Sequence, residues 1–297
     1  MLFPIADRPS NPSPPRRPVA AGVLGLAVCC GFFAAAASAQ QSSDMPAAVQ
    51  PGYEILIARQ EAMYMRLDDP RAGGAGTIDS YNLETTFAYG IDRDKALMLH
   101  VPVMHWDLEN PSALPDADGS GIDDIPLMFQ WRFLQQDLGA IDTRRAVLLT
   151  GVELPSYDPN FSSDSFDPLL GIAYTQIHGR HGFNASALWK FNTSADTGYH
   201  VDFGDSKHDA FKLDLAYLYR LAPEQYAADT QGSHYLQLQL LNRYETSGDT
   251  QSIFAPGWMY EGRRWAYEAT LHLPIAQDLD HRAEMQWGVN LGIRYLF

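Results

Sequence analysis

Apolar and polar residues alternate along much of the chain, most clearly at its C-terminal end. In residues 285–297 every second side chain is apolar, from Met285 to Phe297, and those between are polar or small. A period of two predicts a β-strand with one apolar and one polar face. Seven successive apolar positions on one face exceed the usual soluble strand. They suit a strand that crosses a membrane with its apolar face outward.

The same alternation recurs along the chain. It is clear in residues 80–91, 122–134, 183–192, 211–221, 234–244 and 265–275, and weaker in residues 53–67, 95–106, 144–154, 166–178 and 252–260. The weaker segments slip register or contain proline, so their facing stays open. With the C-terminal segment the count is twelve, and an even count returns both ends of a barrel to one side of the membrane. We therefore predict an all-β fold: a single transmembrane antiparallel β-barrel of about 12 strands over residues 53–297.

The connections between the segments support this topology. Those after the second, sixth and tenth segments are short, whereas those after odd-numbered segments are mostly longer and rich in Asp, Gly, Pro and Ser. Short periplasmic turns and longer outer loops are typical of outer-membrane barrels. The connection near residues 222–232 is long for a periplasmic turn, which leaves a miscounted strand there as an alternative.

Charged residues of the clear segments fall on the polar, lumen-facing side. We predict ten pore-lining side chains: Glu84, Arg132, Lys190, Lys212, Asp214, Arg220, Arg243, Glu268, His272 and Arg294. A charge facing lipid costs about 2–4 kcal/mol at the membrane midplane, so the lumen is its favourable place. Two interpretations stay open: mutual salt bridges that fill the lumen, or a lining that selects solutes. A ring of about twelve strands predicts a narrow lumen, open unless loops or the N-terminal segment fill it.

The N-terminus predicts export. Arg16 and Arg17 precede the apolar run VAAGVLGLAVCCGFFAAAA, which ends at Ala37-Ser38-Ala39. This pattern indicates a cleaved signal peptide over residues 1–39, with an uncleaved membrane anchor as the alternative. Residues 40–52 are then expected to form a periplasmic linker. Both cysteines lie inside the apolar run, so the exported chain is expected to have no disulfide or thiol chemistry.

The charge and aromatic content of the chain limit the classes of partner that suit it. The formal net charge is −15 and aromatic residues make up 12% of the chain. An acidic chain is a poor match for nucleic acid, whereas many aromatic side chains suit a membrane interface. We expect outer-membrane lipid and small organic solutes as partners. The C-terminal strand, ending in Phe297, is expected to engage the barrel-assembly machinery.

The stretch DADGSGIDDIPLMFQWRFL, residues 116–134, first suggests a calcium loop. As an EF-hand it fails, because the twelfth position counted from Asp116 is Leu127 and not a bidentate Glu. Its second half alternates as a strand, so a solvated acidic turn entering the membrane is expected, with weak surface calcium binding as the alternative.

Several motifs resemble one bacterial outer-membrane family. Gly121 and Asp124 before an alternating strand, GVELPSYDP at 151–159, FDPLLGIAYTQ at 166–176 and GVNLGIRYLF at 288–297 are similar to the family named after the meta-pathway of phenol degradation, of MetA type. The resemblance covers roughly residues 53–297, although the Gly-x-Gly-Asp entry is imperfect. It implies a barrel for the passage of small, often aromatic or hydrophobic compounds, and it supplies no catalytic residues.

The sequence gives little indication of a metal, cofactor or catalytic site. The nine histidines show no metal-ligand spacing, and no phosphate-binding glycine loop is visible, so neither a metal nor another cofactor is expected. We predict a passive channel in the bacterial outer membrane rather than an enzyme. The alternatives are a structural or adhesive barrel, and an outer-membrane hydrolase in which His272 or the Asp123–Asp124 pair would act.

Overall fold

The computed structural model describes residues 41–69, 76–109, 117–158, 161–193 and 207–297. The chain divides into two units, Met1–Ala35 and Ala36–Phe297, and the second contains all the described residues. The predicted signal peptide, residues 1–39, and Asp116 therefore lie outside them. Among the described residues, no helix is long and apolar enough to span a membrane.

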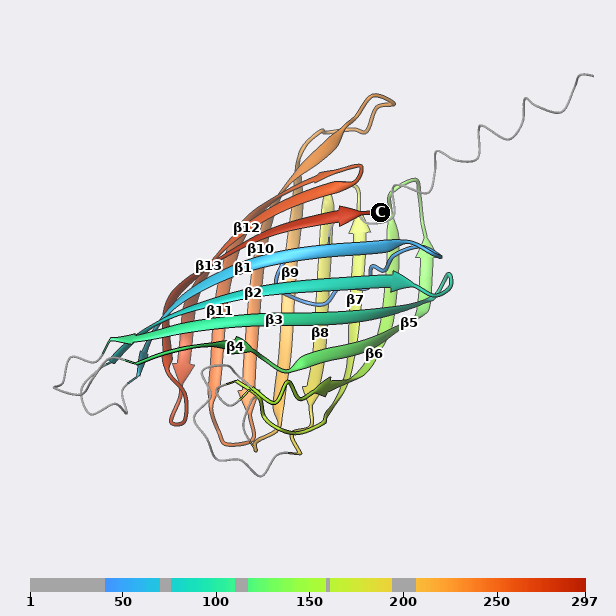
Figure 1. Ribbon diagram of the computed structural model, residues 1–297. Coiled ribbons are helices and arrows are strands. Elements are labelled where there is room, and N and C mark those ends of the chain that lie inside the picture. The colour runs from blue at the N-terminus through green and yellow to red at the C-terminus, as the bar shows by residue number, and fades with distance from the viewer. Residues whose placement is uncertain (1–40, 70–75, 110–116, 159–160, 194–206) are drawn as a thin grey trace, which may run out of the picture. The chain divides into compact units, whose positions relative to one another are not determined.

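Thirteen strands form one antiparallel sheet that closes on itself (Figure 1). They are β1 (Leu56–Asp69), β2 (Gly76–Gly90), β3 (Lys95–Glu109), β4 (Ala117–Ile122), β5 (Ile125–Asp137), β6 (Thr143–Leu154), β7 (Asp167–His178), β8 (His181–Lys190), β9 (Ala210–Ala222), β10 (Gly232–Glu245), β11 (Thr250–Gly262), β12 (Trp265–Asp278) and β13 (Glu284–Leu296). The first strand pairs with both β2 and β13, and β2 pairs with β3, which closes the ring. A closed ring satisfies the backbone amides that lipid cannot.

Two of these strands share one place in the barrel wall. β3 pairs with β4 over residues 103–108 and with β5 over residues 95–99. β4 and β5 are therefore one interrupted strand, broken at Asp123 and Asp124. The ring has twelve positions, which confirms the predicted barrel and its strand count.

The outer face of the wall is apolar and exposed. Leu83, Phe133 and Leu213 are among the exposed side chains, and the polar residues beside them point inward. Aromatic rings gather near one end of the barrel, where Tyr295 lies 4.4 Å from Trp265 and 4.7 Å from Phe297 between ring centroids. Apolar bands with aromatic rings toward the interfaces are the surface that lipid requires.

One predicted facing is wrong. Met285 was expected to point outward with the rest of its strand, but it is buried, with only 4% of its surface exposed. The register between β1 and β13 shifts where Arg66 pairs with Trp287 and Leu67 with Met285, so Gln286 is an extra residue. A bulge of one residue reverses the facing of everything beyond it.

The two ends of the barrel differ in their connections. At what we call the short-turn end the connections span residues 91–94, 138–142, 179–180, 223–231 and 263–264, and the chain also ends there. At the opposite, long-loop end the connection between β6 and β7 spans residues 155–166. Two other connections at that end, over residues 246–249 and 279–283, are as short as those at the short-turn end. The long connection at 223–231 hides no further strand, which removes the miscount considered from the sequence.

Candidate functional site in the barrel lumen

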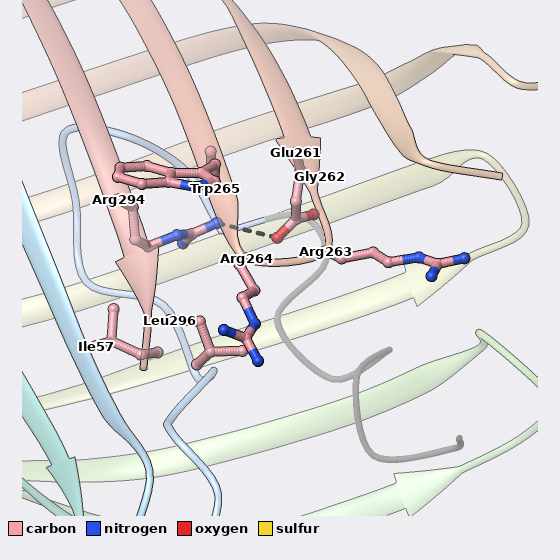
Figure 2. Close-up of a pocket in the computed structure, with 9 residues that line it drawn as sticks. Ile57, Glu261, Gly262, Arg263, Arg264, Trp265, Arg294 and Leu296 are labelled. Carbon is pink, nitrogen blue, oxygen red and sulfur yellow. Dashed lines mark hydrogen bonds and ion pairs between the residues drawn. The ribbon is translucent and has the colours of Figure 1, made fainter. Parts of the chain in front are cut away.

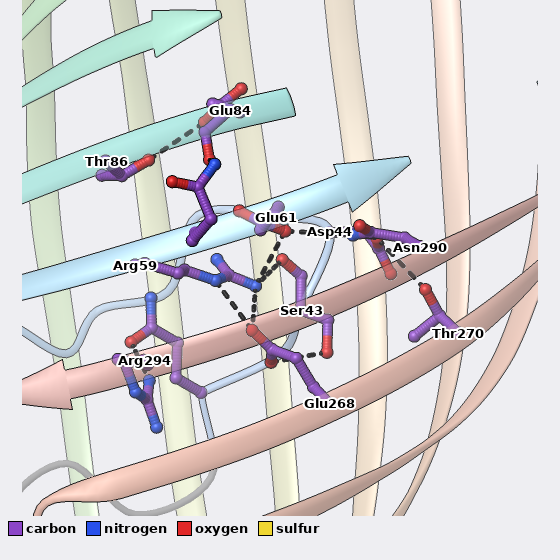
Figure 3. A network of polar contacts seen from close by, with 12 residues as sticks. Ser43, Asp44, Arg59, Glu61, Glu84, Thr86, Glu268, Thr270, Asn290 and Arg294 are labelled. Carbon is purple, nitrogen blue, oxygen red and sulfur yellow. Dashed lines mark hydrogen bonds and ion pairs between the residues drawn. The ribbon is translucent and has the colours of Figure 1, made fainter. Parts of the chain in front are cut away.

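Residues 41–50 lie inside the barrel, in a segment we call the inserted loop. Ser43, Ala48 and the residues between are almost all buried, and Ala48 has no exposed surface. A periplasmic linker was expected over residues 40–52, with an N-terminal segment that fills the lumen as the alternative. Residues 41–50 are hydrogen-bonded to inner side chains of the wall, which favours that alternative. Figure 3 shows Ser43 and Asp44 of the inserted loop between side chains of β1, β12 and β13.

Asp44 is the most heavily bonded residue of the inserted loop. Its carboxylate accepts hydrogen bonds from Gln239 Nε2 at 2.5 Å and Asn290 Nδ2 at 2.7 Å, and lies 3.1 Å from His272 Nε2. Thr270 Oγ1 donates a further bond at 3.3 Å. Burial alone would raise the pKa of Asp44, but the hydrogen bond and charge of His272, with the bonds from Asn290 and Thr270, lower it to about 2. Asp44 is therefore held as an anion.

The rest of the inserted loop is bonded around the wall. Ala48 N donates to Thr175 Oγ1 on β7 at 2.9 Å, and Gln130 Nε2 on β5 donates to the carbonyl of Ala47 at 3.2 Å. Its two ends return to the short-turn end, where Gln41 accepts from Arg294 at 2.7 Å and Gln50 donates to the carbonyl of Arg93 at 3.2 Å. Both ends of the inserted loop therefore lie at the same mouth of the barrel.

A largely buried network of ion pairs holds the inserted loop against β1 and β12. Arg59 on β1 lies 2.7 Å from Glu268 and 3.1 Å from Glu61, and also donates to the carbonyl of Ser43. Ser43 Oγ donates to Glu268 at 2.8 Å (Figure 3). One arginine therefore links two wall strands to the inserted loop, with its charge balanced by carboxylates as a buried charge requires.

All ten predicted pore-lining residues lie on the inner face of their strands, and most have partners. Ion pairs join Arg132 to Asp94 (3.1 Å), Lys190 to Glu153, Arg243 to Asp214 (2.6 Å), Glu268 to Arg59, and Arg294 to Glu261 (3.0 Å). The ring of His100 contacts Glu84 (2.8 Å), and the ring of His272 contacts Asp44. Arg220 lies over the ring of Tyr226, 4.2 Å from its centroid. This pairing favours the interpretation in which the charges stabilise the wall.

Lys212 differs from the other nine. Among the described residues it has no hydrogen bond or ion pair, and the charges that act on it are those of Arg243, Asp214, Glu153 and Lys190. It stands directly opposite Arg243 in the pairing of β9 with β10. Two like charges at paired positions destabilise a sheet, and the carboxylates of Asp214 and Glu153 offset part of this repulsion near the long-loop end.

Sequence reasoning missed the residues that matter most here. Asp44 and Ser43 lie in a segment without periodicity, so the sequence allowed an N-terminal segment in the lumen but did not single out these two residues. Arg59 and Glu61 occupy alternate positions, as two residues on the lumen side of a strand should. Between them, the lipid side of β1 carries Gln60, and this polar residue hid the apolar face in the sequence. An acidic residue two positions from an arginine in a membrane strand was the available signal.

The acidic stretch before β5 anchors a loop. The buried carboxylate of Asp124 accepts hydrogen bonds from the amides of Ser156 and Ser163, both at 2.9 Å, and from Ser163 Oγ at 2.5 Å. Ser165 Oγ donates to Asp167 at 2.8 Å in the same cluster. These bonds engage both oxygens of Asp124 in holding residues 155–158 and 161–166. Among the described residues, no group of three His, Cys, Asp or Glu side chains could hold a metal ion.

A shallow pocket opens at the short-turn end. It lies between Ile57, Leu296 and the turn from β11 to β12, where Arg263 and Arg264 extend from the wall (Figure 2). Arg294 reaches Glu261 across it and also holds Gln41, so this pocket adjoins the point where the inserted loop enters.

Comparison with known proteins identifies a family for the chain and a solved structure with the same fold. A family model described as "Putative MetA-pathway of phenol degradation" matches residues 72–261. The COG4313 outer membrane channel from Pseudomonas putida F1 shares the fold, with a TM-score of 0.59 at 14% identity over 87% of this chain and 100% of that one. The β domain of the Bordetella autotransporter BrkA gives a TM-score of 0.47 at 15% identity, over 82% of this chain and 99% of that one. No curated protein sequence matches the chain.

Proposed function

The chain belongs to the MetA-pathway of phenol degradation family, and from that premise we propose that it is a passive outer-membrane channel for small apolar or aromatic compounds, closed at rest by the inserted loop. The exposed apolar belt suits lipid on every side of the ring. A passive channel needs only a path and a concentration gradient, which fits a barrel with no expected cofactor.

One observation carries this proposal: the lumen has room for a second piece of chain. In the narrowest barrels the side chains of the wall fill the interior. Here the wall leaves space for residues 41–50, whose contacts with Thr175, Gln237 and Gln239 are hydrogen bonds that water could replace. Withdrawal of the inserted loop would open a path along the barrel axis, lined by polar groups and by the apolar side chains that pack against Met45.

The test is conductance in planar bilayers. The full exported chain should give small steps, and a variant lacking residues 41–50 should give steps several-fold larger, because the occupant of the lumen is gone. A variant in which those ten residues are replaced by Gly and Ser at equal length separates loss of contacts from loss of volume. It should open often but briefly.

Uptake tests the proposed substrates. Vesicles containing the variant without residues 41–50 should take up phenol faster than vesicles containing the full chain. If the deletion variant folds but neither conducts nor speeds uptake, the channel proposal fails and a structural barrel becomes the better account.

A further inference from the structure

The four groups around Asp44 form a buried receptor for a carboxylate. They are the side chains of Gln239, Thr270, His272 and Asn290, on β10, β12 and β13, and each has at most 5% of its surface exposed. Because the ring is closed by backbone pairing, the wall does not need these polar groups for closure. Their shared partner is a carboxylate from a segment outside the wall.

An apolar site adjoins this receptor. Met45, the next residue of the inserted loop, is 4% exposed and packs in a cluster of buried side chains that includes Tyr235, Leu241, Met259 and Met285. Methionine-rich surfaces adapt to apolar groups of varied shape. Asp44 and Met45 together therefore present a negative head beside an apolar body.

Two buried atoms of the receptor lack a partner. Among the described residues, Asn290 Oδ1 and His272 Nδ1 have no hydrogen bond. A buried polar atom without a partner costs about 1–3 kcal/mol. A hydroxyl on a ligand could supply the missing bond to Asn290.

We propose that the receptor around Asp44 and the apolar cluster around Met45 together form a binding site for solutes that carry a carboxylate on a compact apolar or aromatic body. Asp44 and Met45 occupy this site until such a solute displaces them. The inference rests on the proposed channel function and names the class of solute. It also gives the polar wall residues a role in recognition.

A cluster of basic side chains lies on the long-loop side of the site. Lys190, Lys212 and Arg243 gather there around the carboxylates of Glu153 and Asp214. Arg243 lies four residues beyond Gln239 on β10, or about 13 Å along the strand. A solute entering from the long-loop end would meet this region before the receptor.

The test measures binding of salicylate to the folded barrel in detergent, by equilibrium dialysis. Salicylamide is the matched probe, because it has the same ring and hydroxyl without the charge. Asp44→Ala should bind salicylate at least tenfold more tightly than the wild type, since the internal competitor is removed. Asp118→Ala, which removes an exposed carboxylate of β4, should bind as the wild type does.

Further variants keep the test decisive. In the Asp44→Ala background, Asn290→Leu should abolish the preference for salicylate over salicylamide. Asp44→Asn serves if Asp44→Ala does not fold, which heat-modifiable migration in gels reveals. Equal salicylate affinity in wild type and Asp44 variants, or equal affinity for the two probes, would overturn the proposal.

The outcomes also separate the two proposals. A deletion of residues 41–50 that conducts without preferring salicylate refutes the carboxylate site and leaves the channel standing. Preferential salicylate binding by a barrel that never conducts supports the site and refutes the channel.

Discussion

At the scale of single residues, the lumen is governed by buried charges that satisfy one another. Arg59 is the central example, because it lies between Glu61 and Glu268 and holds the carbonyl of Ser43. Removing one partner of a buried ion pair costs about 3–5 kcal/mol, since the other charge is left uncompensated.

Arg59→Met should therefore lower the free energy of unfolding by about 3–5 kcal/mol, measured by urea titration in lipid vesicles. The double variant Arg59→Met/Glu268→Met should recover part of the loss, because it removes a stranded carboxylate as well. A single variant as stable as the wild type would show that these charges are solvated rather than buried.

The surroundings of Asp249, in the connection between β10 and β11, predict that the stability of the fold depends on pH. This residue lies outside the membrane-spanning strands. Burial would raise its pKa, but the His281 side chain and the amides of Asp280 and His281 bond to the carboxylate and lower the pKa overall. Its stabilising effect is then complete above the ordinary aspartate pKa of about 4 and disappears as the pH falls through the lower folded value.

Asp249→Asn should consequently lower the melting temperature at pH 7, and the difference from wild type should shrink in acid below about pH 4. Thermal melts across this range provide the measurement. A difference that grows toward acid pH would contradict the assigned direction.

The candidate site could be predicted from sequence only where alternation marks a side of a strand. Alternation placed Glu268, His272 and Arg294 in the lumen, because a charge on the outer face would meet lipid. It could not reveal Asp44, because the inserted loop has no repeating pattern and is held by long-range hydrogen bonds. Partner identity depends on the register between strands far apart in sequence.

At the scale of the strand, the two faces obey different rules. Leu291 on β13 is 54% exposed and faces lipid, whereas its neighbour Asn290 is buried against the inserted loop. The reversal at Met285 shows the limit of this reasoning, since a bulge is set by pairing with β1 and leaves no mark in the sequence of β13 alone.

Leu291→Arg should hinder assembly, at a cost of about 2–4 kcal/mol near the membrane midplane. The folded fraction after refolding into vesicles measures this, and Leu291→Met, which keeps an apolar side chain, should refold normally. If the arginine variant refolds as well as the methionine variant, position 291 does not face the hydrocarbon core.

At the scale of the whole barrel, closure is the property that the sequence predicts best. Twelve alternating segments predicted twelve positions, although β4 and β5 were expected as one shorter strand. Closure follows from the cost of unpaired amides in lipid, so it depends little on particular side chains. What fills the lumen depends on them entirely.

The folded chain should accordingly migrate faster than the heated chain in detergent gels, and its far-ultraviolet circular dichroism should be that of β-sheet. The wild type and the variant without residues 41–50 should both behave so, because the wall closes through its own backbone. A helical spectrum would rule out the barrel.

Both ends of the inserted loop lie at one mouth, with Gln41 held by Arg294 and Gln50 by the carbonyl of Arg93. Residues 51–55 join the loop to β1, so Asp44 stays tethered close to its receptor when the loop withdraws. A short flexible tether gives an effective concentration in the millimolar range. An external solute competes only if its concentration reaches that range or if it binds the receptor more tightly than Asp44 does. The barrel would therefore open when the solute is abundant and stay closed when only traces are present.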